Sequence, residues 1–121
     1  MNFIFLAIKE HPWGREMLSQ LLDAEFKPSL VIQEFSEGGE IEREKFEFRI
    51  GKHTMAPTME SQAAERDIPV VEVPIHNDEH CMEHIGKAEP DLIVFGGTRI
   101  IRGKILEYGE SRGGVLNSHP G

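Results

Sequence analysis

The stretch EPDLIVFGGTRIIRGKILEYGESRGGVLNSHPG, residues 89–121, decides the fold predicted for this chain. Residues 91–95 form an almost continuously apolar run between a proline and two glycines, which is typical of a parallel strand buried on both faces. A short helical turn and a second buried strand at 115–116 follow, and that strand runs into Asn, Ser and His. Ligands of open parallel sheets bind beyond the carboxyl ends of the strands. We therefore expect residues 96–99 and 117–119 to face one crevice.

The remainder of the chain alternates between apolar runs and helical patterns. Further strands are predicted at 2–8, 29–35 and 68–73, and the first of these is apolar enough to be central. A first helix is predicted to begin at Pro12, with one apolar stripe formed by Trp13, Met17, Leu18, Leu21 and Leu22. A second is predicted at 57–66, with Met59, Ala63 and Ala64 facing inward. A third is predicted to run from an N-cap at Asn77 or Asp78 to about Lys87. This order predicts an α/β, Rossmann-like, doubly wound and mostly parallel sheet with helices on both faces.

Residues 36–53 are rich in Glu, Lys, Arg and Gly and interrupt this alternation. Phe46, Phe48 and Ile50 alternate with polar residues, so the segment could form a short strand at 45–50 or a solvated, partly helical insertion. We expect a charged, mobile surface insertion at about 36–53, near the rim of the active site.

Composition and charge describe a globular domain. Of the 121 residues, 39% are hydrophobic and 28% are charged, and the formal net charge of -8 argues against a nucleic-acid partner. No run reaches the ~18 apolar residues of a membrane span, and residues 2–8 lack the flanks of a signal peptide. One cysteine excludes an internal disulfide and fits a reducing compartment. We expect a cytoplasmic protein without membrane or nucleic-acid partners.

The strings PDLIVFGGTRII, residues 90–101, and GGVLNSHPG, residues 113–121, resemble the folate-dependent formyltransferases, whose fingerprint is a strand ending in Asn-x-His-Pro. The likeness is close over this strand-turn-strand pair. Elsewhere the chain is similar only in layout to the N-terminal half of the catalytic domain of glycinamide ribonucleotide, methionyl-tRNA and sugar formyltransferases. The resemblance implies transfer of a formyl group from 10-formyltetrahydrofolate to a primary amine of a small molecule, such as an amino sugar, without a metal.

The same resemblance implies roles for two groups of residues. Asn117 and His119 take the catalytic positions that flank the formyl group. An amine attacking that carbon creates an oxyanion, which an amide donor and a histidine can stabilise. The segment that holds the pterin ring of the folate corresponds to Gly97, Thr98, Arg99 and Ile101. Basic side chains at the rim, Arg99 and Arg102, could meet the carboxylates of a folate tail.

The loop after the first strand is a candidate substrate site from topology alone. Lys9, Glu10 and His11 follow the carboxyl end of that strand and should point toward the same crevice. The loop contains neither GxGxxG nor a P-loop, so it predicts no dinucleotide or ATP. It also departs from the glycine- and serine-rich phosphate cradle of glycinamide ribonucleotide formyltransferases, which disfavours a phosphorylated purine precursor as substrate.

The family's catalytic Asp, a few dozen residues beyond the His, has no counterpart before Gly121. We therefore expect residues 1–121 to be the N-terminal part of a formyltransferase-like domain, truncated after the fifth strand and inactive alone. A missing C-terminal half or a second copy of the chain is the expected partner. Two alternatives stay open: a non-catalytic α/β ligand-binding or interaction module, and a hydrolase that releases formate from the same folate.

Three histidines at 76, 80 and 84 are spaced as on one helix face and could bind zinc or nickel. The segment lacks CxxC and HExxH, and His76 should precede the helix, so we expect an exposed polar face and no metal. Cys81 has no basic neighbour to activate it, and we expect a half-buried small apolar residue.

Overall fold

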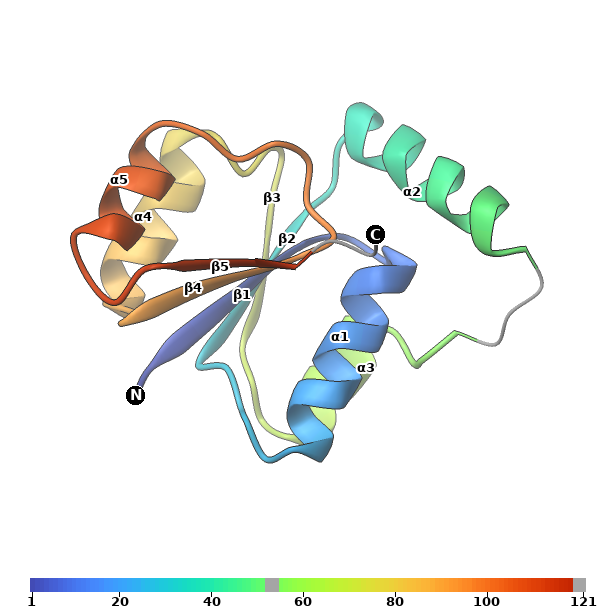
Figure 1. Cartoon of the computed structure of the whole chain (residues 1–121), viewed down its shortest axis with the longest axis horizontal. Coiled ribbons are helices and arrows are strands. Elements are labelled where there is room, and N and C mark those ends of the chain that lie inside the picture. Colours follow the sequence, from blue (N-terminus) through green and yellow to red (C-terminus); the bar gives the residue numbers. More distant parts are fainter. Residues whose placement is uncertain (52–54, 119–121) are drawn as a thin grey trace.

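A single parallel sheet organises the chain, whose structure, a computed structural model, describes residues 1–51 and 55–118 (Figure 1). Within these residues the strand order is β3-β2-β1-β4-β5, and every neighbouring pair is parallel. The strands are β1 (Phe3–Ile8), β2 (Leu30–Glu34), β3 (Val70–Val73), β4 (Leu92–Gly96) and β5 (Val115–Ser118). The doubly wound fold and the central position of the first strand are confirmed.

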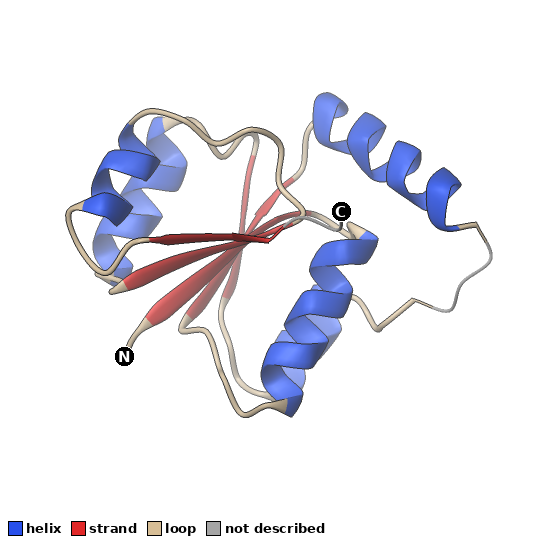
Figure 2. Ribbon diagram, viewed as in Figure 1, coloured by secondary structure: helices blue, strands red, loops and turns tan. Residues whose placement is uncertain are grey.

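Helices cover both faces of this sheet (Figure 2). The structure places α1 (Pro12–Asp23) and α3 (Met59–Glu65) on one face, and α4 (Glu79–Ala88) and α5 (Lys104–Glu110) on the other. A further helix, α2 (Glu37–Ile50), follows β2 and lies above α1 in Figure 1. Over the described part of the chain, no helix is both long and apolar enough to cross a membrane.

The core consists of two layers that share β1, whose six side chains are all buried. Ile4 and Leu6 pack toward α4 and α5 with Ile85 and Ile105, whereas Phe5 and Ala7 face α1 and α3. Burying a large apolar side chain stabilises a fold by roughly 1.5–3 kcal/mol. Both layers therefore hold the carboxyl ends of β1 and β4 in fixed positions.

The charged segment after β2 forms a regular helix, so the strand considered for residues 45–50 is wrong. Ser36 caps α2 by accepting a hydrogen bond from the Gly39 N–H, and Arg43 pairs with Glu40 and Glu47 one turn away on either side. Such pairs support a helix without an apolar stripe. The alternating aromatics fall on different helix faces, and Phe48 is 88% exposed. Residues 52–53 of the predicted insertion lie outside the described residues.

Two smaller predictions have different outcomes. In α3, Met59 and Ala63 are buried as predicted, but Ala64 is exposed, so its predicted inward position is wrong. The seven-residue helix has room for only one narrow buried stripe, which Gln62 shares. In α4, Asp78 is the N-cap and accepts a hydrogen bond from the Cys81 N–H, which confirms the predicted start of that helix.

Candidate functional site

A cavity of about 870 Å³ opens at the carboxyl edge of the sheet, on the side of α4 and α5. Its wall is built by the loop 98–103 after β4, the residues that follow β3, the first turns of α4 and α5, and Glu34 at the end of β2. The site therefore collects residues from strands that are neighbours in space but distant in sequence. Three of the predicted cofactor-binding residues line it: Thr98, Arg99 and Ile101.

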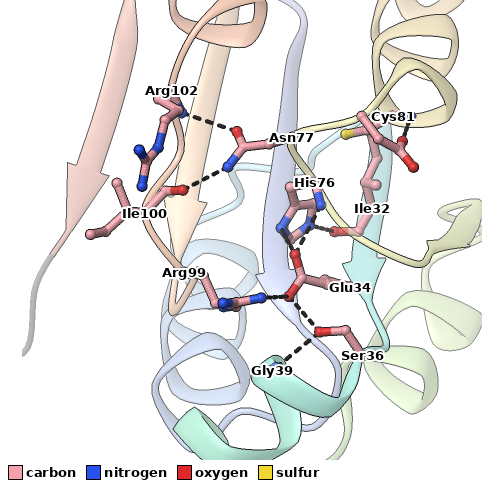
Figure 3. A network of polar contacts seen from close by, with 11 residues as sticks. Ile32, Glu34, Ser36, Gly39, His76, Asn77, Cys81, Arg99, Ile100 and Arg102 are labelled. Atoms are coloured by element: carbon pink, nitrogen blue, oxygen red, sulfur yellow. Dashed lines mark hydrogen bonds and ion pairs between the residues drawn. The ribbon is translucent and has the colours of Figure 1, made fainter.

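Asn77 fixes the backbone of the loop that forms this wall. Its side-chain amide donates to the Ile100 carbonyl at 2.8 Å, and its side-chain oxygen accepts from the Arg102 N–H at 3.0 Å (Figure 3). The two bonds hold two main-chain groups on either side of Ile101, which points its side chain into the core. The loop is therefore attached to the end of β3 before any ligand binds.

Gly97, the fourth predicted cofactor-binding residue, joins this loop to β1. Its carbonyl accepts the Ile8 N–H at 2.9 Å, and its φ of +75° lies in the left-handed region that favours glycine. A Cβ at this position would lie 2.6 Å from His11 Nδ1. Gly97 therefore allows the loops after β1 and β4 to touch at the point where the winding of the sheet reverses.

His11, one of the predicted substrate-binding residues, is buried and caps α1. Its Nδ1 accepts the Trp13 N–H at 3.1 Å, and its ring lies 4.8 Å from that of Phe46 in α2. Burial, with smaller contributions from Arg43 and Arg49, lowers the pKa of His11 to about 4. The imidazole is therefore neutral near pH 7 and carries its proton on Nε2.

The other two residues of this loop point elsewhere. Lys9 donates to Glu72 at 2.9 Å, and that hydrogen bond raises the pKa of the lysine. Lys9 also lies 3.7 Å from Glu60 and over the Phe35 ring, so its charge is already compensated by β3 and α3. Glu10 is exposed in a left-handed conformation. The structure thus places all three residues at the carboxyl edge, but only His11 contacts the loop after β4.

Glu34, at the carboxyl edge of the sheet, is a residue of this site that was not predicted from the sequence. Its carboxylate is 1% exposed, accepts the Ser36 hydroxyl at 2.8 Å and the His76 N–H at 2.9 Å, and lies 3.9 Å from the Arg99 guanidinium (Figure 3). A signal was present in the sequence, because Gln33 and Glu34 are polar residues at the end of a predicted strand whose preceding residues are apolar. Both are buried in the structure.

His76 lies in the core beside this carboxylate and precedes α4, as predicted. Its Nε2 bonds the Ile32 carbonyl at 3.0 Å, and because a carbonyl only accepts, Nε2 must carry the proton. Burial lowers the pKa of His76, which outweighs the opposing effects of that hydrogen bond and of Glu34. The ring is therefore neutral, and its Nδ1 faces Glu34 at 3.6 Å without a hydrogen bond among the described residues.

The histidines that were candidate metal ligands do not share one environment. His76 is buried before the helix, while His80 is exposed and His84 partly exposed on α4. Among residues 1–51 and 55–118, no group of three or more His, Cys, Asp or Glu is placed to hold a metal ion. Cys81 is fully buried, and burial raises the pKa of its thiol to about 12. A thiol in this environment is not nucleophilic near pH 7.

The predicted catalytic residues lie at the end of β5. Asn117 pairs in register with Phe95 and is exposed. Registered partners of parallel strands share a face, so Asn117 projects toward the side of Phe95, the side of α4 and α5. His119 lies outside the described residues, and both catalytic assignments stay predictions.

The arrangement combines apolar walls with polar groups that converge on them. Ile75, Ile100, Ile101, Met82 and Ile105 supply apolar surface. Arg99, Arg102 and Lys104 supply positive charge, and the carboxylates of Glu34, Glu42, Asp78 and Glu79 line the same cavity. Such a site suits a partly apolar molecule with polar groups at its edges.

Comparisons with known proteins support the fold. No model of a known protein family matches the chain, and no curated protein sequence matches it. Among solved structures, phosphoribosylglycinamide formyltransferase from Streptococcus pneumoniae TIGR4 is similar, with a TM-score of 0.58 and 16% sequence identity. The alignment covers 98% of this chain and 56% of that one. The chain therefore shares its fold with a formyltransferase over about half of that protein's length.

Proposed function

We propose that this chain binds a folate-type formyl donor in the cavity beside the loop 98–103. It would do so as part of an N-formyltransferase that moves a formyl group from 10-formyltetrahydrofolate to a primary amine of a small molecule. The observation that carries the proposal is the cavity itself. The loop that resembles the pterin-binding segment forms the wall of a site of about 870 Å³, inside a fold shared with a formyltransferase.

The residues present suit such a donor. Main-chain groups around Thr98, Arg99 and Ile101 would bond the polar edge of the pterin, and the neighbouring isoleucines would contact its faces. Arg102 and Lys104 line the same cavity and are exposed, so they would meet the carboxylates of the folate tail. An amino sugar is the first acceptor to test, because the loop after β1 lacks a phosphate cradle.

The proposed chemistry is acyl transfer. The acceptor amine forms a bond to the formyl carbon and loses a proton, while the bond to the folate nitrogen breaks and that nitrogen takes up a proton. The Asn117 amide would stabilise the negative charge that develops on the formyl oxygen, and His119 would assist the proton transfers. Loss of one such donor typically raises the barrier by about 2.7–4 kcal/mol.

A non-catalytic binding module is the second candidate, and one observation favours it. The described residues that line the cavity fall between positions 34 and 105, and Asn117 is not among them. This favours a chain that binds the donor without turning it over. We expect this behaviour of the 121-residue chain, with transfer requiring further residues.

Calorimetric titration with folinic acid, a stable formyl folate, tests the proposal. We expect binding by the wild-type chain, weakened roughly threefold to tenfold by Arg102→Ala because one charge-assisted contact is lost. Arg66→Ala, at an exposed position after α3, is the matched control and should bind like the wild type. Absence of binding at millimolar folinic acid, or equal weakening by both variants, would refute a folate site in this cavity.

A transfer assay separates the two candidates. With 10-formyltetrahydrofolate and an amino sugar, the 121-residue chain should release no formylated product. If product does form, the expectation of inactivity is wrong, and Asn117→Ala should then lower kcat roughly a hundredfold. Formate release without an added amine would indicate the hydrolase instead.

A further inference from the structure

The buried carboxylate of Glu34 joins segments that are far apart in the sequence. It ends β2, and its partners come from the start of α2, from the segment between β3 and α4 and from the loop after β4 (Figure 3). A buried charge lowers stability unless its partners compensate it, and an apolar side chain of similar size often packs at least as well. The burial of this carboxylate therefore indicates that Glu34 has a role besides packing in the core.

Arg99 is held between Glu34 and the first turn of α2. Its guanidinium lies 3.9 Å from the carboxylate and directly against Gly38, where an added Cβ would be 2.6 Å from Arg99 Cζ. At Gly39, a Cβ would lie 2.9 Å from the Ser36 hydroxyl and 3.2 Å from Glu34 Oε2. Glycine is a poor helix former, but here two glycines leave the space that Arg99 and Glu34 occupy.

The second attachment of the same loop also leads back to Glu34. Glu34 Oε1 accepts the His76 N–H, and the next residue, Asn77, bonds the main chain of Ile100 and Arg102. The Glu34 carboxylate is thus connected to the loop in two ways. It contacts the Arg99 side chain directly, and its hydrogen bond to the His76 N–H fixes the neighbouring Asn77, which holds the loop backbone. Both attachments act on the wall of the cavity.

We propose that Glu34 is a positioning residue that fixes the loop 98–102 for ligand binding, by holding Arg99 against Gly38 and by anchoring Asn77 through the His76 amide. The inference rests on the proposed function only where it names the ligand as a folate-type donor. The attachment of the loop is a property of the chain itself. Glu34 belongs to the cavity wall but its side chain is almost fully buried, and its contacts are with the loop and its supports.

Glu34→Gln tests the proposal with little change of shape, because the amide oxygen can still accept the His76 N–H while the charge facing Arg99 is lost. We expect hydrogen exchange of the amides at 100–102 to accelerate roughly tenfold, a typical effect of losing a charged partner. Exchange of the amides of β1 should stay at the wild-type rate. Acceleration throughout the chain, or no change at 100–102, would overturn the positioning role.

Two further variants keep the test independent of folding and of the folate proposal. Gly38→Ala should displace Arg99 and accelerate the same amides, whereas Gly86→Ala, where a Cβ meets nothing within 4 Å, is the matched helical control. Because Glu34 and Arg99 act as one unit, Glu34→Gln/Arg99→Gln should accelerate the loop no more than the stronger single variant. Additive acceleration would show that the two residues act separately.

Folinic acid titration of the same variants connects the loop to the ligand. If the wild type binds, Glu34→Gln should bind about tenfold more weakly, while Gly86→Ala binds as the wild type does. If the wild type does not bind but the loop exchange changes as expected, the folate proposal fails and the positioning role stands. If binding is unchanged in Glu34→Gln, the role in ligand binding is wrong.

Discussion

Two buried polar sites lie at the same edge of this sheet, and they were assembled in different ways. The His11 site is local, since a neutral imidazole caps the helix that starts at the next residue and lies against Gly97 in the loop after β4. The Glu34 site is distributed, because its carboxylate joins residues from four separate segments. One site caps the start of a helix, and the other determines how several segments are placed relative to each other.

The two sites differ in how they accommodate a buried polar side chain. His11 avoids the cost of a buried charge by staying neutral, with its pKa lowered to about 4. At Glu34, hydroxyl, amide and guanidinium groups surround the carboxylate (Figure 3). Removing Glu34 should therefore disturb more of the molecule than removing His11.

The largest expected effect is that of Glu34→Ala on stability. The substitution leaves the His76 N–H and the Ser36 hydroxyl without their buried acceptor, and we expect the free energy of unfolding to fall by about 3 kcal/mol. His11→Ala loses one helix cap and should cost about 1 kcal/mol. Urea unfolding at pH 7, followed through the fluorescence of the single tryptophan, Trp13, measures both.

Glu72→Ala provides the control for removal of a glutamate. Glu72 lies on the neighbouring strand, is exposed, and pairs with Lys9 at the surface, so its loss should cost no more than about 1 kcal/mol. If Glu34→Ala lowered the free energy of unfolding no more than Glu72→Ala or His11→Ala does, the Glu34 site would not stabilise the arrangement of the segments that it joins. The distinction between the two sites would then be wrong.

The contrast between local and distributed sites also explains what could be predicted from the sequence. Strands and helices are local patterns, and parallel strands buried on both faces give apolar runs such as residues 3–8 and 92–96. The N-cap Asp78 is likewise a local signal. The position of His11 at the crevice followed from topology, but its role as a cap was not predicted, although it directly precedes Pro12.

The distributed site could not be found in this way. Glu34 contacts His76 and Arg99, which lie 42 and 65 positions further along the chain. No local sequence pattern indicates that these three residues meet. The two glycines of α2 were interpreted as part of a charged, mobile surface insertion, whereas they leave the space that Arg99 and Glu34 occupy. The helix itself was obscured because its charged pairs replace the apolar stripe that sequence patterns detect.

A second prediction concerns the contact between the two loops at Gly97. Gly97→Ala adds a Cβ 2.6 Å from His11 Nδ1 and requires a left-handed φ of +75°, so we expect a loss of about 3 kcal/mol. Gly51→Ala is the matched control, because its φ of +66° is similar but a Cβ there meets nothing within 4 Å. The control should lose only the backbone strain, about 2 kcal/mol, because its ψ of -129° is also unfavourable for a residue with a Cβ.

The difference between these two variants isolates the contact with His11. The double substitution His11→Ala/Gly97→Ala removes the ring that the new Cβ would strike, so it should be less costly than the sum of the two single variants. Chemical denaturation of the four proteins gives this coupling. Additive losses would mean that the imidazole does not limit the space at Gly97, and the local site would then be independent of the loop after β4.

The last prediction concerns the pH dependence of stability that follows from the lowered pKa of His11. In the unfolded chain His11 takes up a proton near its ordinary pKa of about 6.5, whereas in the folded chain its pKa is lowered to about 4. Between these values the unfolded state binds more protons. The stability is therefore fully present above about pH 6.5 and is lost progressively as the pH falls toward about 4.

Each pH unit in this window should lower the free energy of unfolding by about 1.4 kcal/mol through His11. The lowered pKa of His76 acts in the same direction. His11→Asn keeps an N-cap acceptor but cannot titrate, so urea unfolding between pH 6 and pH 4.5 should show a slope smaller by about that amount. The slope that remains in this variant includes the contribution of His76 beside Glu34.

Equal slopes in the wild type and His11→Asn would mean that the folded chain protonates His11 as readily as the unfolded one. The cap would then have to break in the folded state, because a protonated Nδ1 cannot accept the Trp13 N–H.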